Sequence, residues 1–149
     1  MAITQAMATS YKVDMLNGFH AFGTSVVRAG TGADTFKVAL STSSATLSAA
    51  TTAYSATNEV SGTGYTAGGA TIVIVQVPTS TSTTAWLDFT DTTWSSSTIT
   101  ARGALIYNST NSNKAVAVLD FGEDKSTSAG DFTIIWPAGS SSLAIIRVA

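Results

Sequence analysis

The sequence predicts an all-β protein: a single, jelly-roll-like β-sandwich of about eight strands, with a short helix at the N-terminal end. Three observations lead to this prediction. Short segments alternate apolar and polar residues, as half-buried strands do. Turn residues separate these segments at intervals of roughly 8–12 residues, and β-branched residues are abundant in each segment. The 149 residues are enough for one domain with one core, which we divide into a helix and arm (1–34) and the sandwich (35–149).

The helix is predicted over residues 11–17. Tyr11, Met15 and Phe19, the last just beyond this range, are spaced i, i+4 and i+8, which places them on one face of a helix. Ser10 is the candidate N-cap, and Gly18 is the candidate C-cap glycine. Residues 23–34 contain three glycines and show no clear periodicity, so we expect a loop or an arm that precedes the first strand.

The strands follow in order along the rest of the chain. They are predicted at 35–40, 71–77, 85–89, 97–101, 103–107, 115–121, 131–136 and 143–148. Pro78 marks the end of the second strand, because proline cannot donate a ladder hydrogen bond. The segment 108–113 is dense in Asn, Ser and Thr and is a predicted turn, and a second polar turn is predicted over 122–130.

One segment, 41–69, is long, polar and rich in small residues. A helical turn is expected around 55–59. The glycines at 62 and 64 match part of a dinucleotide-binding fingerprint, but a strand follows them instead of a helix, so we interpret them as a glycine-rich loop. Loops of this length inside a domain are uncommon and tend to carry contacts.

The composition limits the classes of function. Charged residues are 11% of the chain, against about 25% in an ordinary domain, whereas Ser and Thr number 45. The net charge of -2 and the scattered basic residues argue against nucleic-acid binding. No apolar run approaches the length of a membrane span, and residues 1–10 lack the features of a secretory signal, so we expect synthesis in the cytoplasm. A surface of hydroxyls with few charges favours packing in an assembly, although glycan-facing proteins share this composition.

Groups for catalysis or metal binding are few. Cysteine is absent, which excludes disulfides and thiolate chemistry. The single histidine, His20, lies near no nucleophile motif and is interpreted as structural or exposed. The acidic residues that are close in sequence are Asp88 and Asp91, and Asp120, Glu123 and Asp124. The second group follows a strand, where polar residues are common, and lacks the EF-hand spacing. We therefore predict no catalytic residues, no metal site and no cofactor.

Aromatic side chains are the remaining candidates for an interface. Trp86 and Trp136 lie within strand patterns and are predicted to be in the core, because large aromatic side chains dominate core burial. Trp94 lies in a polar segment and is a candidate for an exposed or interfacial side chain, with burial as the alternative. Tyr54 and Tyr65, from the long loop, complete the set of predicted interface residues.

Six segments, taken in order, resemble a family of small structural proteins of tailed bacteriophages. They are MLNG (15–18), FKVAL (36–40), YSATNEVSGTGY (54–65), STITARGALIYN (97–108), LDFG (119–122) and GDFTIIWP (130–137). The resemblance covers most of the chain, from about residue 11 to residue 148, and the segments are specific as a set but weak individually. The stretch 19–32 is longer here than in the family pattern.

This resemblance implies a β-sandwich on the outside of an icosahedral head, often as a homotrimer, with no catalytic residues. The first hypothesis is therefore a non-enzymatic cement or decoration protein, located on the capsid surface of the virion, that stabilises the lattice of the major capsid protein. The alternative is a tail or fibre component that binds host-surface glycans through Trp94, Tyr54 or Tyr65. An enzyme such as a glycan hydrolase has the least support.

Overall fold

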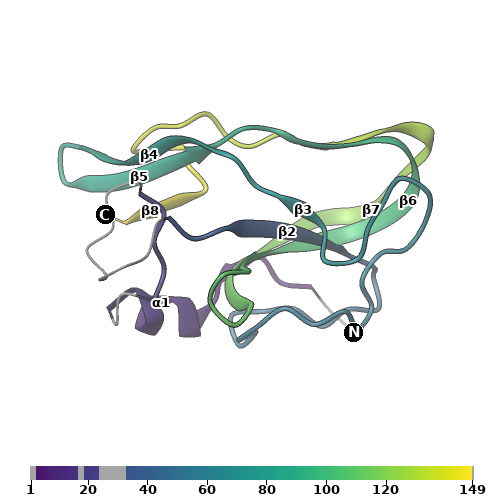
Figure 1. Cartoon of the computed structure of the whole chain (residues 1–149), viewed down its shortest axis with the longest axis horizontal. Coiled ribbons are helices and arrows are strands. Elements are labelled where there is room, and N and C mark those ends of the chain that lie inside the picture. The colour runs from purple at the N-terminus through teal and green to yellow at the C-terminus, as the bar shows by residue number, and fades with distance from the viewer. Residues whose placement is uncertain (1–2, 17–18, 24–32, 149) are drawn as a thin grey trace.

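Two antiparallel sheets, of five and three strands, make up the fold that the computed structural model describes for residues 3–16, 19–23 and 33–148 (Figure 1). The elements are β1 (Ala6–Met7), α1 (Thr9–Leu16), β2 (Phe36–Ser41), β3 (Ala70–Thr71), β4 (Ile74–Thr81), β5 (Thr84–Phe89), β6 (Thr92–Asn108), β7 (Lys114–Ile134) and β8 (Ile146–Val148). The strand order is β1-β7-β6-β2-β3 in the larger sheet and β4-β5-β8 in the smaller one. The predicted all-β, sandwich-like fold with one short helix is confirmed.

β6 and β7 form one long hairpin, of 17 and 21 residues, that is central to the larger sheet. The predicted separate strands at 97–101 and 103–107 are parts of β6, and the predicted turn over 122–130 lies inside β7, so both of these predictions are wrong. The reason is a set of β-bulges, which let a strand bend without ending. At the largest, residues 121–124 lie opposite the single residue Arg102.

The bulges allow this hairpin to change direction. Figure 1 shows the β6–β7 ribbon turning over at the right-hand end of the molecule. Ser96, Gly122 and Ala129 have positive φ angles of 51°, 79° and 51°, which fit irregular points in the strands rather than regular ladder positions. The glycine and small polar residues that suggested a chain reversal therefore produce a bend within a continuous ribbon.

Hydroxyl pairs connect the two strands of this ribbon. Three of them join side-chain oxygens at 2.8–2.9 Å: Thr93 with Thr133, Ser97 with Thr127, and Thr100 with Ser126. Cross-strand Thr and Ser pairs stabilise a sheet in the way that opposite charges do elsewhere. The high Ser and Thr content is thus partly explained by bonds that the strands make with each other.

The predicted strand 71–77 is divided between the two sheets. β3 pairs with β2 in the larger sheet, and after Ile72 and Val73 the chain continues as β4 in the smaller sheet. Pro78 does not end β4, because β4 is an edge strand and Pro78 lies at a register shift between Gln76 and Thr79, a place where proline is tolerated. β8 begins three residues later than predicted.

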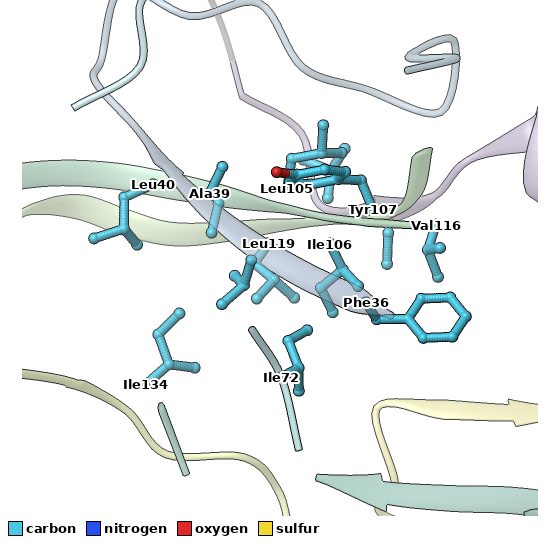
Figure 2. Close-up of a cluster of buried hydrophobic side chains, with 14 of the residues drawn as sticks. Phe36, Ala39, Leu40, Ile72, Leu105, Ile106, Tyr107, Val116, Leu119 and Ile134 are labelled. Carbon is cyan, nitrogen blue, oxygen red and sulfur yellow. The ribbon is translucent and has the colours of Figure 1, made fainter. Parts of the chain in front are cut away.

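The larger sheet is buried on both faces where β2 and the adjoining halves of β6 and β7 lie side by side. In Figure 2, Leu40 and Ile106 point from this sheet toward Ile72, whereas Ala39 and Leu105 point to the opposite side. All five side chains are buried. Burial on both faces explains why the C-terminal part of β6, residues 103–107, reads as a continuous apolar run instead of an alternating one.

The helix begins earlier than predicted. α1 starts at Thr9, so Ser10 lies inside the helix and is not its N-cap. The N–H groups of Ala8 and Thr9 donate to the carbonyls of Val116 and Ala49, so neighbouring strands and loops determine where the helix starts. The predicted C-cap Gly18 and residues 24–32 of the predicted arm lie outside the described residues.

Other parts of the N-terminal region belong to the core. Ile3, Ala8, Tyr11 and Phe22 are buried and pack with the sandwich. Phe22 stacks on Phe36 of β2, with ring centroids 4.1 Å apart. None of the helices within the described ranges is long and apolar enough to span a bilayer.

Asn108 joins three segments that are far apart in sequence. Its fully buried amide donates from Nδ2 to Asp34 Oδ2 (2.7 Å) and bonds to His20 Nδ1 (3.1 Å). Its Oδ1 accepts from the N–H groups of Thr110 and Asn111, which shapes the hairpin turn. His20 therefore takes part in a structural hydrogen-bond network at the end of the β6–β7 hairpin.

Candidate functional site

The loop 41–69 covers the face of the larger sheet that is opposite the smaller sheet, and Figure 1 shows its first part there. Three backbone hydrogen bonds, each 2.9 Å long, join it to different elements: Thr4 N to Leu47 O, Ala115 N to Thr52 O, and Val60 N to Leu40 O. The helical turn expected over 55–59 is wrong, because the chain forms a β-turn there, closed by the hydrogen bond from Glu59 N–H to Ala56 O, with Asn58 at a left-handed φ of 60°. The loop is thus held along its length.

Glu59 lies at the centre of a polar cluster under this loop. Its Oε1 accepts hydrogen bonds from the Tyr65 hydroxyl (2.7 Å) and the Gly68 N–H (2.8 Å). Its Oε2 accepts from the Tyr54 hydroxyl (2.6 Å). The Tyr65 hydroxyl in turn accepts from the N–H of Leu40 in β2 (2.9 Å). This carboxylate therefore fastens both halves of the loop to the sheet.

Tyr107 completes the cluster from β6. Its hydroxyl donates to Gly68 O (2.8 Å), and its ring stacks on Tyr54 with centroids 4.6 Å apart. Burial, together with the hydrogen bond to Glu59, raises the pKa of Tyr54 to about 12. Burial and the same carboxylate also raise the pKa of Tyr65 and of Tyr107 above the ordinary value.

These shifts predict a loss of stability at high pH. Because the pKa of each phenol is higher in the folded chain than the ordinary 10.0, the unfolded chain releases these protons first. The free energy of unfolding should therefore be level below pH 10 and fall as the pH rises toward 12. Urea unfolding at a series of pH values, with tyrosinate absorbance, measures this.

Tyr65→Phe is the matched variant for this titration. It removes one phenol with a raised pKa, so the fall in stability above pH 10 should be less steep than in the wild type. Tyr11, whose pKa burial also raises, stays in both proteins and contributes equally. An equally steep fall in the variant would contradict the assignment of Tyr65 to this alkaline transition.

A cavity of about 520 Å³ lies beside the cluster, between the loop and the sheet. Ala39 and Leu105 of the sheet line it on one side. Ser and Thr residues of the loop line the rest, together with Tyr54, Glu59, Asn58, Leu47 and three alanines. The predicted contact loop therefore forms a concave surface of mixed apolar and polar character.

The three predicted interface residues have different environments. Tyr54 and Tyr65 are half-buried and belong to the Glu59 cluster. Trp94 is only 6% exposed and packs between Tyr65 and Phe132, so the expectation of an exposed indole is wrong. Its strand lies over the core, and the alternation of β6 turns this side chain inward although its sequence neighbours are polar.

Of the predictions for the other two tryptophans, one is confirmed and one is wrong. Trp136 is buried against Phe89, as predicted. Trp86 is half-buried, because β5 turns Leu87 and Phe89 inward and Trp86 toward the other face. Its Nε1 donates to Thr81 Oγ1 at 3.2 Å. The prediction that Trp86 is a core residue is therefore wrong.

A second candidate surface is the edge of the smaller sheet at β4. Val73, Val75 and Val77 are 61%, 64% and 38% exposed. β5 pairs with one side of β4, and the other side faces no strand among those of the described residues. An exposed apolar edge strand is a template for pairing with another chain.

Two of the acidic residues that were considered for chemistry accept hydrogen bonds from backbone groups of the fold. Asp91 accepts from the Trp136 N–H (2.9 Å), and Asp120 accepts from the Gly122 N–H (2.9 Å). In the part of the chain that the structure describes, no three His, Asp or Glu side chains come together in a group able to hold a metal ion.

Two important polar residues, Glu59 and Asn108, were not singled out in the sequence. Glu59 is the only charged residue in the segment 41–69, and that isolation is a signal that could have identified it. Asn108 lies in the Asn-rich turn, where nothing local separates it from its neighbours.

Comparison of the chain with protein-family models, curated proteins and solved structures finds no match.

Proposed function

We propose that the protein is a non-enzymatic structural protein of a phage particle, a cement or decoration protein that binds the outside of the head. There it would stabilise the lattice of the major capsid protein. The resemblance of six sequence segments to small phage structural proteins supports this proposal. The single observation that carries it is the exposed apolar edge at β4.

Natural proteins normally protect such an edge. Lys side chains, inward-pointing charges, proline, β-bulges or a covering loop hinder the pairing of a second chain there. The stretch 70–84, which contains β4, has no charged residue at all. Val73, Val75 and Val77 are instead exposed along it. This combination suits β-augmentation, in which an extended segment of the capsid subunit adds to the sheet and its apolar side chains contact the valines.

The pairing segment is short. Register shifts occur between Ile74 and Gln76 and between Gln76 and Thr79, and Pro78 lacks an N–H. One such contact is weak. A homotrimer on a symmetric lattice point would make several at once, and multivalent attachment raises the overall affinity without stronger individual contacts.

Val75→Lys tests the edge directly. Val75 is 64% exposed, so the fold should tolerate lysine, whereas a charge on the edge should block strand addition. We expect this variant to lose cosedimentation with particles that lack the protein, while its thermal unfolding stays like that of the wild type. Thr83→Lys, in the exposed β4–β5 turn, is the matched control and should still bind. Equal binding by both variants would show that β4 is not the attachment site.

The function itself is tested on particles. Deleting the coding sequence from the phage that carries it should lower the resistance of the virions to heat and osmotic shock, and adding the purified protein should restore it. Unchanged resistance would exclude the cement role.

The alternative, a tail or fibre component that binds host-surface glycans, draws support from the cavity beneath loop 41–69.

A further inference from the structure

The cavity beneath loop 41–69 has the size of a ligand site. Its volume of about 520 Å³ falls within the range of about 300–1,000 Å³ that is usual for pockets that bind small molecules. A mostly apolar floor with a few fixed polar groups is the usual composition of such pockets. Ala39 and Leu105 lie at its base but are almost fully covered, so the loop supplies the accessible apolar lining, from Leu47, Ala50 and Ala53, as well as the polar groups.

The chemistry of the lining selects the class of ligand. Thr52, Ser55 and Thr57 contribute hydroxyls, which donate and accept hydrogen bonds. Glu59 contributes a carboxylate, and the lining contains no Lys, Arg or His. A negatively charged ligand would be repelled by Glu59 and would find no cation, so the lining suits a neutral ligand with several hydroxyl groups.

Glu59 has room for one more donor. A carboxylate has about four acceptor positions. Tyr65, Gly68 and Tyr54 fill three of them, two on Oε1 and one on Oε2. Because Glu59 lines the cavity, the remaining position on Oε2 is the one that a ligand hydroxyl would take. The accessible apolar lining of the loop can pack against the C–H face of a sugar ring, which is the other recognisable feature of a carbohydrate.

The cavity is also held in shape before any ligand arrives. The loop that covers it is bonded to the N-terminal segment, to the β6–β7 hairpin and to β2. The Tyr54–Tyr107 stack and the Glu59 cluster fix its inner side. A preformed site loses less conformational entropy when it binds.

We propose that this cavity binds a neutral carbohydrate of one or two rings, with a ring face on the accessible apolar lining of the loop and a hydroxyl donated to Glu59 Oε2. The site lies on the loop and not on the β4 edge. It is therefore independent of the proposed attachment to a capsid, and either proposal can fail without the other.

The test is binding of neutral and sialylated oligosaccharides to the full chain, by glycan array and by saturation-transfer NMR with the best hit. Ala50→Trp fills the cavity from an exposed lining position, and Ala53→Trp is a second filling variant should the first not fold. Ala56→Trp is the matched control, since Ala56 is exposed on the same loop but does not line the cavity.

We expect neutral sugars to bind the wild type and Ala56→Trp alike, and Ala50→Trp to lose at least about tenfold in affinity, which corresponds to 1.4 kcal/mol. Three results would overturn the proposal: no neutral glycan bound, sialylated glycans bound as well as neutral ones, or binding that the filling variants leave unchanged.

Discussion

Replacing Trp94 with alanine is expected to lower the free energy of unfolding by about 3–5 kcal/mol, the usual cost of deleting a buried aromatic side chain. The indole is 6% exposed, with its ring 5.9 Å from that of Tyr65 and 6.1 Å from that of Phe132. Removing it leaves a cavity between the loop 41–69 and β7 and exposes both neighbours. Urea unfolding of the purified variant measures the loss.

Trp86→Ala is the control for this prediction. Trp86 is half-buried, and its hydrogen bond to Thr81 is exposed to water, so its removal should cost less than half as much as the removal of Trp94. If Trp94→Ala were the milder of the two, the assignment of Trp94 to the core would be wrong and an interfacial role would regain support.

Replacing Asn108 with aspartate is expected to lower the free energy of unfolding by at least about 1–3 kcal/mol, the usual cost of removing the hydrogen-bond partner of a buried polar group. The Asn108 amide donates to the buried Asp34 carboxylate at 2.7 Å and contacts His20 at 3.1 Å. Aspartate would replace that donor with a second carboxylate next to the first. Chemical denaturation near neutral pH measures this loss.

Asn113→Asp, in the same turn, is the control, because it shows how much an Asn-to-Asp substitution alone changes the free energy of unfolding. Asn113 is exposed and has a φ of 54°, which Asp tolerates nearly as well, so a change within about 0.5 kcal/mol is expected. Two adjacent carboxylates also raise the pKa of one of them, so protonation should relieve the loss in Asn108→Asp as the pH falls. A loss that is the same at neutral and mildly acidic pH would contradict a charge-based cause.

The success of the sequence predictions differs between elements for a physical reason. β2 and β5 were predicted to within one residue, because the alternation that defines them is local. The turn 122–130 was wrong, because Gly122 and Ala129 permit both a chain reversal and a bulge. Which of the two forms depends on whether β6 continues opposite them, and no local pattern contains that information.

For the candidate sites too, features that depend on local sequence were predicted, and features that depend on distant segments were not. Loop 41–69 was correctly predicted as a long loop from its composition. The Glu59 cluster was not predicted, because it requires Tyr107 from β6 and Leu40 from β2 to meet the loop. The Asn108–Asp34 bond joins residues 74 positions apart. Attachment to a phage capsid stays a prediction from the sequence resemblance, with the β4 edge as its structural support.

Composition and short-range alternation by themselves determined that this chain is an all-β protein with a hydroxyl-rich, weakly charged surface. Both are properties of neighbouring residues, and they persist in whatever way the strands are arranged. The tertiary structure decided that Trp94 is buried, that Trp86 is not, and that Glu59 binds two tyrosines. Burial and pairing depend on which distant segments come into contact, and the folding of the whole chain sets those contacts.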